Sequence, residues 1–203
     1  MAAAASNPCG VAESPWQPLQ LHTLSACRLA IGRYPAFLYN GRGGGGPGQT
    51  TESRDGGASI LRFPAETLSI PPLNSTSTRF LGLPLPPGLS IAIAAEDLSG
   101  RWSPERGAIA LNFRARFRFR ANLAGRAFYA PPDLQIACTL TSGSVQGVRH
   151  SASGQPLAAD GRARLVGVAR VEPCGDALLD RFLGLPDEAL AVLECRIDTR
   201  SAP

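Results

Sequence analysis

The chain has 203 residues, of which 44% are apolar and 18% are charged, a composition typical of one globular domain with a tail. All 20 basic residues are arginines, and the missing lysine excludes P-loop nucleotide-binding proteins, pyridoxal enzymes and protein kinases, whose chemistry needs a lysine amine. The net charge of +4 suits an anionic partner without requiring one.

Residues 1–58 differ in composition from the rest of the chain. They open with MAAAAS, close with the glycine-rich GRGGGGPGQ, and hold a single acid, Glu13, before Glu52. Such a composition favours an organellar transit peptide, and a disordered extension is the alternative. Residues 21–39 could form a short amphipathic helix, and Gly43–Gly46 is typical of a flexible linker. The expected location is an organelle, with the chloroplast favoured and the cytoplasm as the alternative.

Residues 59–203 are predicted to form one antiparallel β domain, a barrel or a sandwich. In GAIALNFRARFRFRA, apolar residues from Ile109 to Phe119 alternate with Asn112 and arginines, which is the period of a long, half-buried strand. Shorter strands are expected at 60–63, 66–70, 89–94, 126–130, 133–141, 162–172 and 189–197, separated by Pro and Gly turns. Small side chains expected to point inward leave open whether the interior is filled: Ala92, Ala110, Ala115, Ala137 and Ala169.

One short helix is predicted before the last strand, in CGDALLDRFLGLP. Asp176 can cap its N-terminus, and Gly184 followed by Pro186 ends it.

The hexapeptide RFLGLP occurs twice, at 79–84 and 181–186. We interpret both copies as one structural solution, in which a helical turn ends, Phe and Leu fill the core, and Gly-x-Pro redirects the chain into a strand. The residues assigned this structural role are Phe80, Gly82, Pro84, Phe182, Gly184 and Pro186. A duplicated half-domain and a docking motif read by a partner are the alternatives.

Cysteine and histidine give no catalytic or metal pattern. The five cysteines, at positions 9, 27, 138, 174 and 195, include no C-x-x-C pair, so reduced thiols are expected and no metal or other cofactor is predicted. Cys138 and Cys195 are expected in the core, where thiols are inert, and Cys174 in a turn. His22 lies in the tail and His150 in a polar loop.

The carboxylates are scattered, and their clusters have structural explanations. Asp176 and Asp180 fit a cap and a solvent-facing acid, and neighbouring acids on a strand point to opposite faces. No nucleophile elbow is present. The sequence therefore predicts a protein that is not an enzyme.

The most informative surface feature is the row Arg114, Arg116, Arg118 and Arg120, spaced about 7 Å apart on one strand face. Aligned guanidinium groups suit anionic lipid head groups or an acidic protein partner. The aromatic residues lie on the opposite face, which argues against nucleic acid, because stacking needs aromatic and basic residues together. Solvated arginines paired with acids of neighbouring strands are the structural alternative.

The function expected from the sequence is therefore non-catalytic binding. The first hypothesis is an organellar protein that engages a lipophilic small molecule or an anionic membrane surface. The second is an accessory or assembly factor that docks on a larger complex through the arginine-rich strand face. No apolar run approaches the roughly 20 residues of a membrane-spanning helix, and the N-terminus lacks a secretory signal.

Overall fold

A computed structural model of the chain describes residues 15–53, 57–124 and 126–198. Within these residues the protein is an antiparallel sheet closed into a ring of eight strands, which confirms the predicted mostly β class. In the order of the ring they are β1 (Gln17–Thr23), β4 (Gly45–Glu52), β5 (Ser59–Phe63), β8 (Leu89–Ser103), β9 (Ala108–Leu123), β11 (Leu134–Thr141), β14 (Arg162–Val171) and β15 (Asp187–Asp198). Pairing of Leu21 in β1 with Ile197 in β15 closes the barrel.

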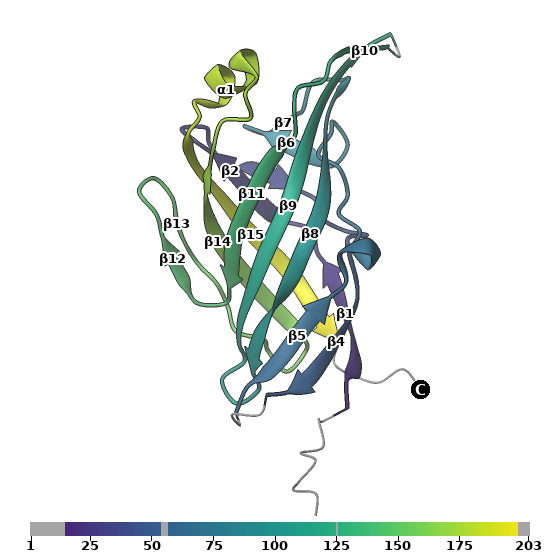
Figure 1. Cartoon of the computed structure of the whole chain (residues 1–203), viewed down its shortest axis with the longest axis vertical. Coiled ribbons are helices and arrows are strands. Elements are labelled where there is room, and N and C mark those ends of the chain that lie inside the picture. Colours follow the sequence, from purple (N-terminus) through teal and green to yellow (C-terminus); the bar gives the residue numbers. More distant parts are fainter. Residues whose placement is uncertain (1–14, 54–56, 125, 199–203) are drawn as a thin grey trace, which may run out of the picture.

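The remaining elements extend or cover this ring (Figure 1). A second wall continues from β15 through β2 (Cys27–Ile31), β3 (Phe37–Tyr39), β6 (Thr78–Phe80) and β7 (Leu83–Pro84). β10 (Arg126–Tyr129) pairs with the end of β9, and the hairpin of β12 (Ser144–Gln146) and β13 (Ser151–Ser153) lies beside β14. One α-helix, α1 (Ala177–Leu183), and one 3-10 turn, η1 (Ala65–Thr67), complete the described elements.

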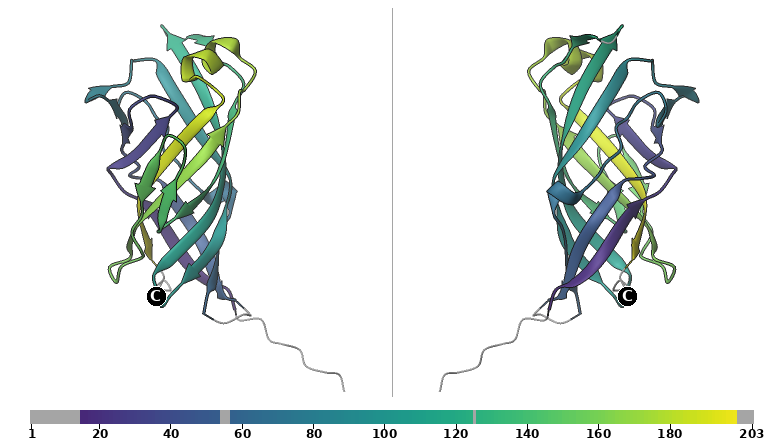
Figure 2. Two further views of the ribbon diagram at one scale, coloured as in Figure 1. Left: turned by 90° about the vertical axis from the view of Figure 1, so that its left-hand side faces the viewer. Right: turned by 90° about the vertical axis from the view of Figure 1, so that its right-hand side faces the viewer.

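The two ends of the barrel differ. The closed end carries β5 and the turn between β8 and β9, whereas the open end carries α1, β10 and the β6–β7 hairpin (Figures 1 and 2). In Figure 2 the sheet spreads at the open end, where β6–β7 lies across from α1. At the closed end, apolar side chains of the strands meet in one buried cluster that includes Leu21, Phe63, Ile109, Leu111 and Leu165.

The predicted boundary at residue 58 is wrong for the described part of the tail. Residues 17–52 form β1 to β4, and β1 and β4 are ring strands. The glycine run is not a linker, because a Cβ on Gly45 would lie 2.0 Å from the Leu21 carbonyl oxygen and one on Gly48 2.4 Å from the Phe63 ring. The glycines therefore let β4 pack closely, and no amphipathic helix forms at 21–39. The transit-peptide prediction for residues 1–14 lies outside the described residues.

Other local predictions have mixed outcomes. The alternation of β9 is confirmed, with Ile109, Leu111 and Ala115 buried and the arginines exposed. The strand expected at 66–70 is wrong: the chain forms η1 and then bridges Ser69 to Gly45. Of the small residues expected inward, Ala115 and Ala169 are buried, but Ala92, Ala110 and Ala137 are exposed, since they occupy the outward register positions of their strands.

The helix prediction is confirmed in detail. The Asp176 side chain accepts hydrogen bonds from the backbone N–H groups of Leu178 and Leu179, and Gly184 adopts the left-handed conformation that ends α1. No helix among the described residues has the length and apolar character needed to cross a membrane.

The first copy of the hexapeptide differs from the prediction. It forms the β6–β7 hairpin, with the turn at Leu81 and Gly82, rather than a helix end. Phe182 of the second copy does not fill the core either, because it is 60% exposed, whereas Leu183 beside it is buried. Identical local sequences thus adopt different structures, since the first copy pairs with β3 and the second forms the last turn and the exit of a capped helix.

Candidate ligand-binding cavity

The interior of the barrel at the open end is hollow, because small residues lie side by side on the inner face of two neighbouring strands. In the pairing of β14 with β15, Gly167 lies opposite Ala191, and Ala169 opposite Ala189. These four residues line the cavity. Elsewhere in the ring, β8 and β9 supply larger lining residues, including Ile93, Phe117 and Phe119. The small pairs therefore leave space that the aromatic wall does not fill.

The cavity has a volume of about 620 Å³, within the range of about 300–1,000 Å³ typical of small-molecule sites. Its lining is almost entirely apolar and comes from strands of the ring, from β2, β3 and β6, and from α1. Leu178, Phe182 and Arg120 belong to the lining and are also exposed to solvent. The cavity therefore reaches the surface at the open end of the barrel.

The tyrosine hydroxyl groups that line the cavity already have partners in the protein. The hydroxyl groups of Tyr34, Tyr39 and Tyr129 donate to the Phe182 carbonyl (2.7 Å), the Pro71 carbonyl (2.5 Å) and the Asp176 carboxylate (2.6 Å). The Thr23 hydroxyl donates to the Gly41 carbonyl. Because these hydrogen bonds belong to the fold, the cavity wall offers a ligand mainly apolar contact.

Burial favours the neutral form of several cysteine and tyrosine side chains of the wall. Burial raises the pKa of the Cys138 thiol to about 11. Burial, followed by the hydrogen bond to Asp176, raises the pKa of Tyr129 to about 12. Burial also raises the pKa values of Tyr39 and Cys27. A charged ligand group would therefore find no counter-charge deep in the cavity.

Both hexapeptide copies contribute to the mouth, where their phenylalanines contact one tyrosine. The Tyr34 ring lies 6.4 Å from the Phe80 ring and 5.5 Å from the Phe182 ring, measured between centroids. Phe80 also stacks on Phe37 at 4.7 Å. These distances are typical of favourable aromatic pairs. The two hexapeptide copies therefore lie on two sides of one entrance to the cavity.

The arginine row lies on the outer face of the barrel. Arg116 forms an ion pair with Glu96 at 2.7 Å, and Arg118 contacts Asp133 through two hydrogen bonds of 3.0 Å. The latter pair lowers the pKa of Asp133. The structure therefore pairs half of the row with neighbouring acids, as the structural alternative expected. Arg114 and Arg120 form no side-chain hydrogen bond or ion pair in the described chain.

Histidine and cysteine are not brought together. Cys138 faces the cavity, whereas His150 lies in the β12–β13 loop, where its backbone N–H donates to Glu188. Cys195 is fully buried, and Cys174 is half-buried in the turn before α1, with its pKa raised mainly by burial. Within residues 15–53, 57–124 and 126–198, no group of three potential metal ligands occurs.

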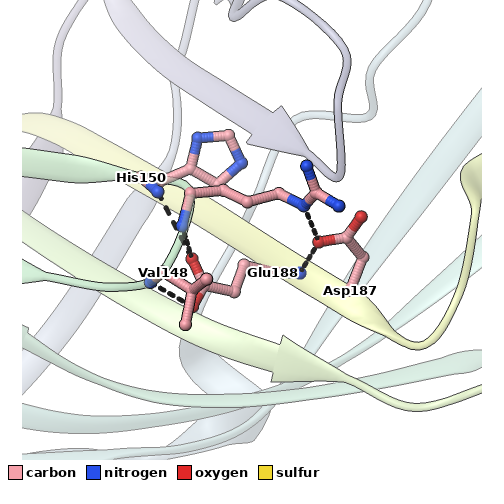
Figure 3. Close-up of polar contacts among 5 residues, drawn as sticks. Val148, His150, Asp187 and Glu188 are labelled. Atoms are coloured by element: carbon pink, nitrogen blue, oxygen red, sulfur yellow. Dashed lines mark hydrogen bonds and ion pairs between the residues drawn. The ribbon is translucent and has the colours of Figure 1, made fainter.

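A polar cluster that the sequence did not indicate fastens the β12–β13 loop to the barrel (Figure 3). The Glu188 carboxylate accepts hydrogen bonds from the backbone N–H groups of Val148 (2.6 Å), Arg149 (2.8 Å) and His150 (3.3 Å). The Arg149 side chain donates to Asp187 at 2.7 Å. These backbone donors lower the pKa of Glu188. Adjacent acids in the sequence therefore act here as a structural clamp.

Comparisons with protein-family models, with curated proteins and with solved structures returned no match. The fold and the cavity together define an antiparallel barrel of eight ring strands with an apolar, solvent-accessible interior.

Proposed function

We propose that the protein is a non-catalytic binding protein that carries a lipophilic small molecule in its barrel cavity. The observation that carries this proposal is the apolar cavity of about 620 Å³, whose lining tyrosine hydroxyl groups are engaged in structural hydrogen bonds. A void of this kind loses dispersion contacts along its wall, and apolar cavities in proteins take up hydrophobic molecules rather than water.

The wall suggests the chemistry of the ligand. Phe117, Phe119 and Phe113 line the β9 side, and the small residues of β14 and β15 form the opposite side. A bulky or extended apolar body fits between them, and its polar group would lie at the mouth, where Arg120 is the charged lining residue. Recognition of such a ligand rests on shape and apolar area rather than on a fixed set of hydrogen bonds.

The proposal omits catalysis for a structural reason. An acyl-transfer or hydrolytic site needs a nucleophile, a base and oxyanion donors that converge on one point. The tyrosines of the cavity are engaged with the fold, and burial disfavours the thiolate of Cys138. These observations support a carrier over an enzyme.

Native mass spectrometry of the full chain, compared with the denatured mass, tests whether a hydrophobe is bound as purified. Titration with the neutral fluorophore N-phenyl-1-naphthylamine then tests whether the ligand-free chain has one saturable apolar site. We expect a co-purified hydrophobe or saturable binding of one fluorophore per chain. A bare chain that also fails to bind the fluorophore would overturn the proposal.

A cavity-blocking variant locates the binding. Ala191→Phe places a ring into the cavity from β15, the strand between β14 and β2. Ala189→Phe places a ring two residues further along β15, nearer to the mouth. Each is expected to abolish fluorophore binding while the far-ultraviolet circular dichroism stays unchanged. The matched control, Ala92→Phe on the exposed outer face of β8, is expected to bind like the native chain. Undiminished binding in folded blocked variants would contradict the assignment of the site.

A further inference from the structure

A ring of exposed apolar side chains surrounds the mouth of the cavity. We call it the apolar rim, and each of its members is 60% exposed or more. Its residues are Leu81 and Leu83 of the β6–β7 hairpin, Leu123 and Phe128 of the β9–β10 hairpin, and Leu178 and Phe182 of α1. Figures 1 and 2 place all three elements at the open end. Large apolar residues gathered at one end of a protein mark an interaction surface.

Exposed arginines stand beside these apolar residues. We call them the rim arginines: Arg33, Arg79, Arg120, Arg126 and Arg181. All are exposed, and in the described chain their side chains make no hydrogen bond or ion pair. The first residue of each hexapeptide illustrates the arrangement, since Arg79 and Arg181 each lie within four residues of two rim side chains. The mouth thus presents basic and apolar groups together.

The acids of the open end are already engaged by other groups, and of the rim arginines only Arg120 interacts electrostatically with one of them, Asp133. Asp133 is paired with Arg118, and Asp187 with Arg149. Asp180 accepts from the backbone N–H groups of Cys174 and Gly175, and Asp176 caps α1. Glu172 is paired with Arg170. The charge left exposed at the mouth is therefore positive, which favours an anionic occupant.

From this arrangement we infer that the open end docks on an anionic lipid bilayer, with the apolar rim inserted among the acyl chains and the rim arginines at the phosphate level. Interfacial membrane binding combines exposed apolar area with basic residues in this way. The inference rests on the proposed function, since it makes the membrane the place where a lipophilic ligand enters or leaves the cavity. The rim shares only Arg120 with the arginine row of β9, whose Arg116 and Arg118 are paired on the barrel wall.

Flotation of the full chain with lipid vesicles tests the inference. The protein is expected to float with vesicles of phosphatidylcholine mixed with phosphatidylglycerol, and to float much less with phosphatidylcholine alone. Each rim arginine replaced should weaken binding about fivefold, so Arg79→Gln, Arg126→Gln and Arg181→Gln together should weaken it about a hundredfold. Leu81→Ser, Leu83→Ser and Phe128→Ser together should also abolish flotation, even with anionic vesicles.

A control variant with the same net charge as the rim-arginine variant separates the effect of position from the effect of total charge. Arg62→Gln, Arg101→Gln and Arg106→Gln remove the same charge from exposed positions at the closed end, and this variant is expected to float almost as well as the native chain. Equal loss in the rim and control variants, or no flotation of the native chain, would overturn the docking inference.

Failure of the carrier proposal and failure of the docking inference give different experimental results. Rim variants are expected to keep binding N-phenyl-1-naphthylamine, and Ala191→Phe is expected to float normally while it binds no fluorophore. A native chain that binds the fluorophore but does not float leaves the carrier proposal standing and removes the docking surface. A chain that floats but binds no fluorophore leaves the docking surface standing and removes the carrier proposal.

Discussion

The two ends of the barrel are built from the same strands but hold different interiors. Ile109 and Leu111, at the start of β9, are buried in the cluster of the closed end, whereas Phe117 and Phe119 of the same strand line the cavity. The difference comes from the size of the inward residues on β14 and β15. At the closed end Leu165 and Ile197 fill the space, and at the open end Gly167, Ala169, Ala189 and Ala191 do not. Strand alternation thus selects the inward residues, and their sizes across the barrel decide whether the interior is filled.

The largest expected effect is the loss of stability from a substitution in the core of the closed end. Ile109 is 2% exposed, so Ile109→Ala should lower the free energy of unfolding by about 2–5 kcal/mol, as the loss of well-packed methylene groups does in protein cores. Ile93→Ala is the matched change on the cavity wall, and we expect it to cost less than half as much, because its side chain already has empty space beside it. Urea unfolding of the ligand-free chain measures both. Equal costs would mean that the two ends are packed alike.

An intermediate effect concerns the Glu188 clamp. Backbone donors lower its pKa in the folded state from the ordinary value of 4.5, so the carboxylate stabilises the attached β12–β13 loop above that pH. This stabilisation is lost as the pH falls through the lowered value. The amide signals of Val148 and Arg149 should therefore shift in an NMR titration with a midpoint below 4.5. Glu188→Gln should remove this titration, while the fluorophore site is retained. A midpoint at or above 4.5 would contradict the clamp.

The smallest expected effect concerns the arginine row outside the barrel. Arg114→Gln, Arg116→Gln and Arg118→Gln together should leave stability and fluorophore binding nearly unchanged, because exposed ion pairs contribute little. Flotation with anionic vesicles should weaken less than in the rim variant. A larger loss than in the rim variant would move the anionic contact from the mouth to the barrel wall. It would thereby favour the sequence-based hypothesis of docking through this strand face.

Several features were predictable because they depend on local patterns. The alternation in β9, the Asp176 cap and the Gly184 exit of α1 follow from short-range geometry, and the structure confirms them. The strands β1 to β4 were missed, because glycine in β4 and polar residues in β1 weaken the strand signal. The strand structure of β1 and β2 depends on pairing with β15, which is distant in the sequence.

The cavity and its rim were beyond sequence reasoning for a different reason. Register partners such as Gly167 and Ala191 are 24 positions apart in the sequence. Their small size indicates a cavity only once the register of β14 and β15 is known. The two RFLGLP copies were visible as a repeat, but their meeting at Tyr34 required the tertiary structure.

The sequence by itself determined an antiparallel β protein with a core of alternating apolar residues, a capped helix before the last strand, and an outward row of arginines. These features follow from periods of two and from capping residues, which act within a few positions of the chain. Only the tertiary structure decided that the glycine-rich segment belongs to the barrel, that the interior is filled at one end and hollow at the other, and that the apolar rim and rim arginines meet at the mouth. Those outcomes depend on which distant residues face one another, a relation set by strand register and barrel closure.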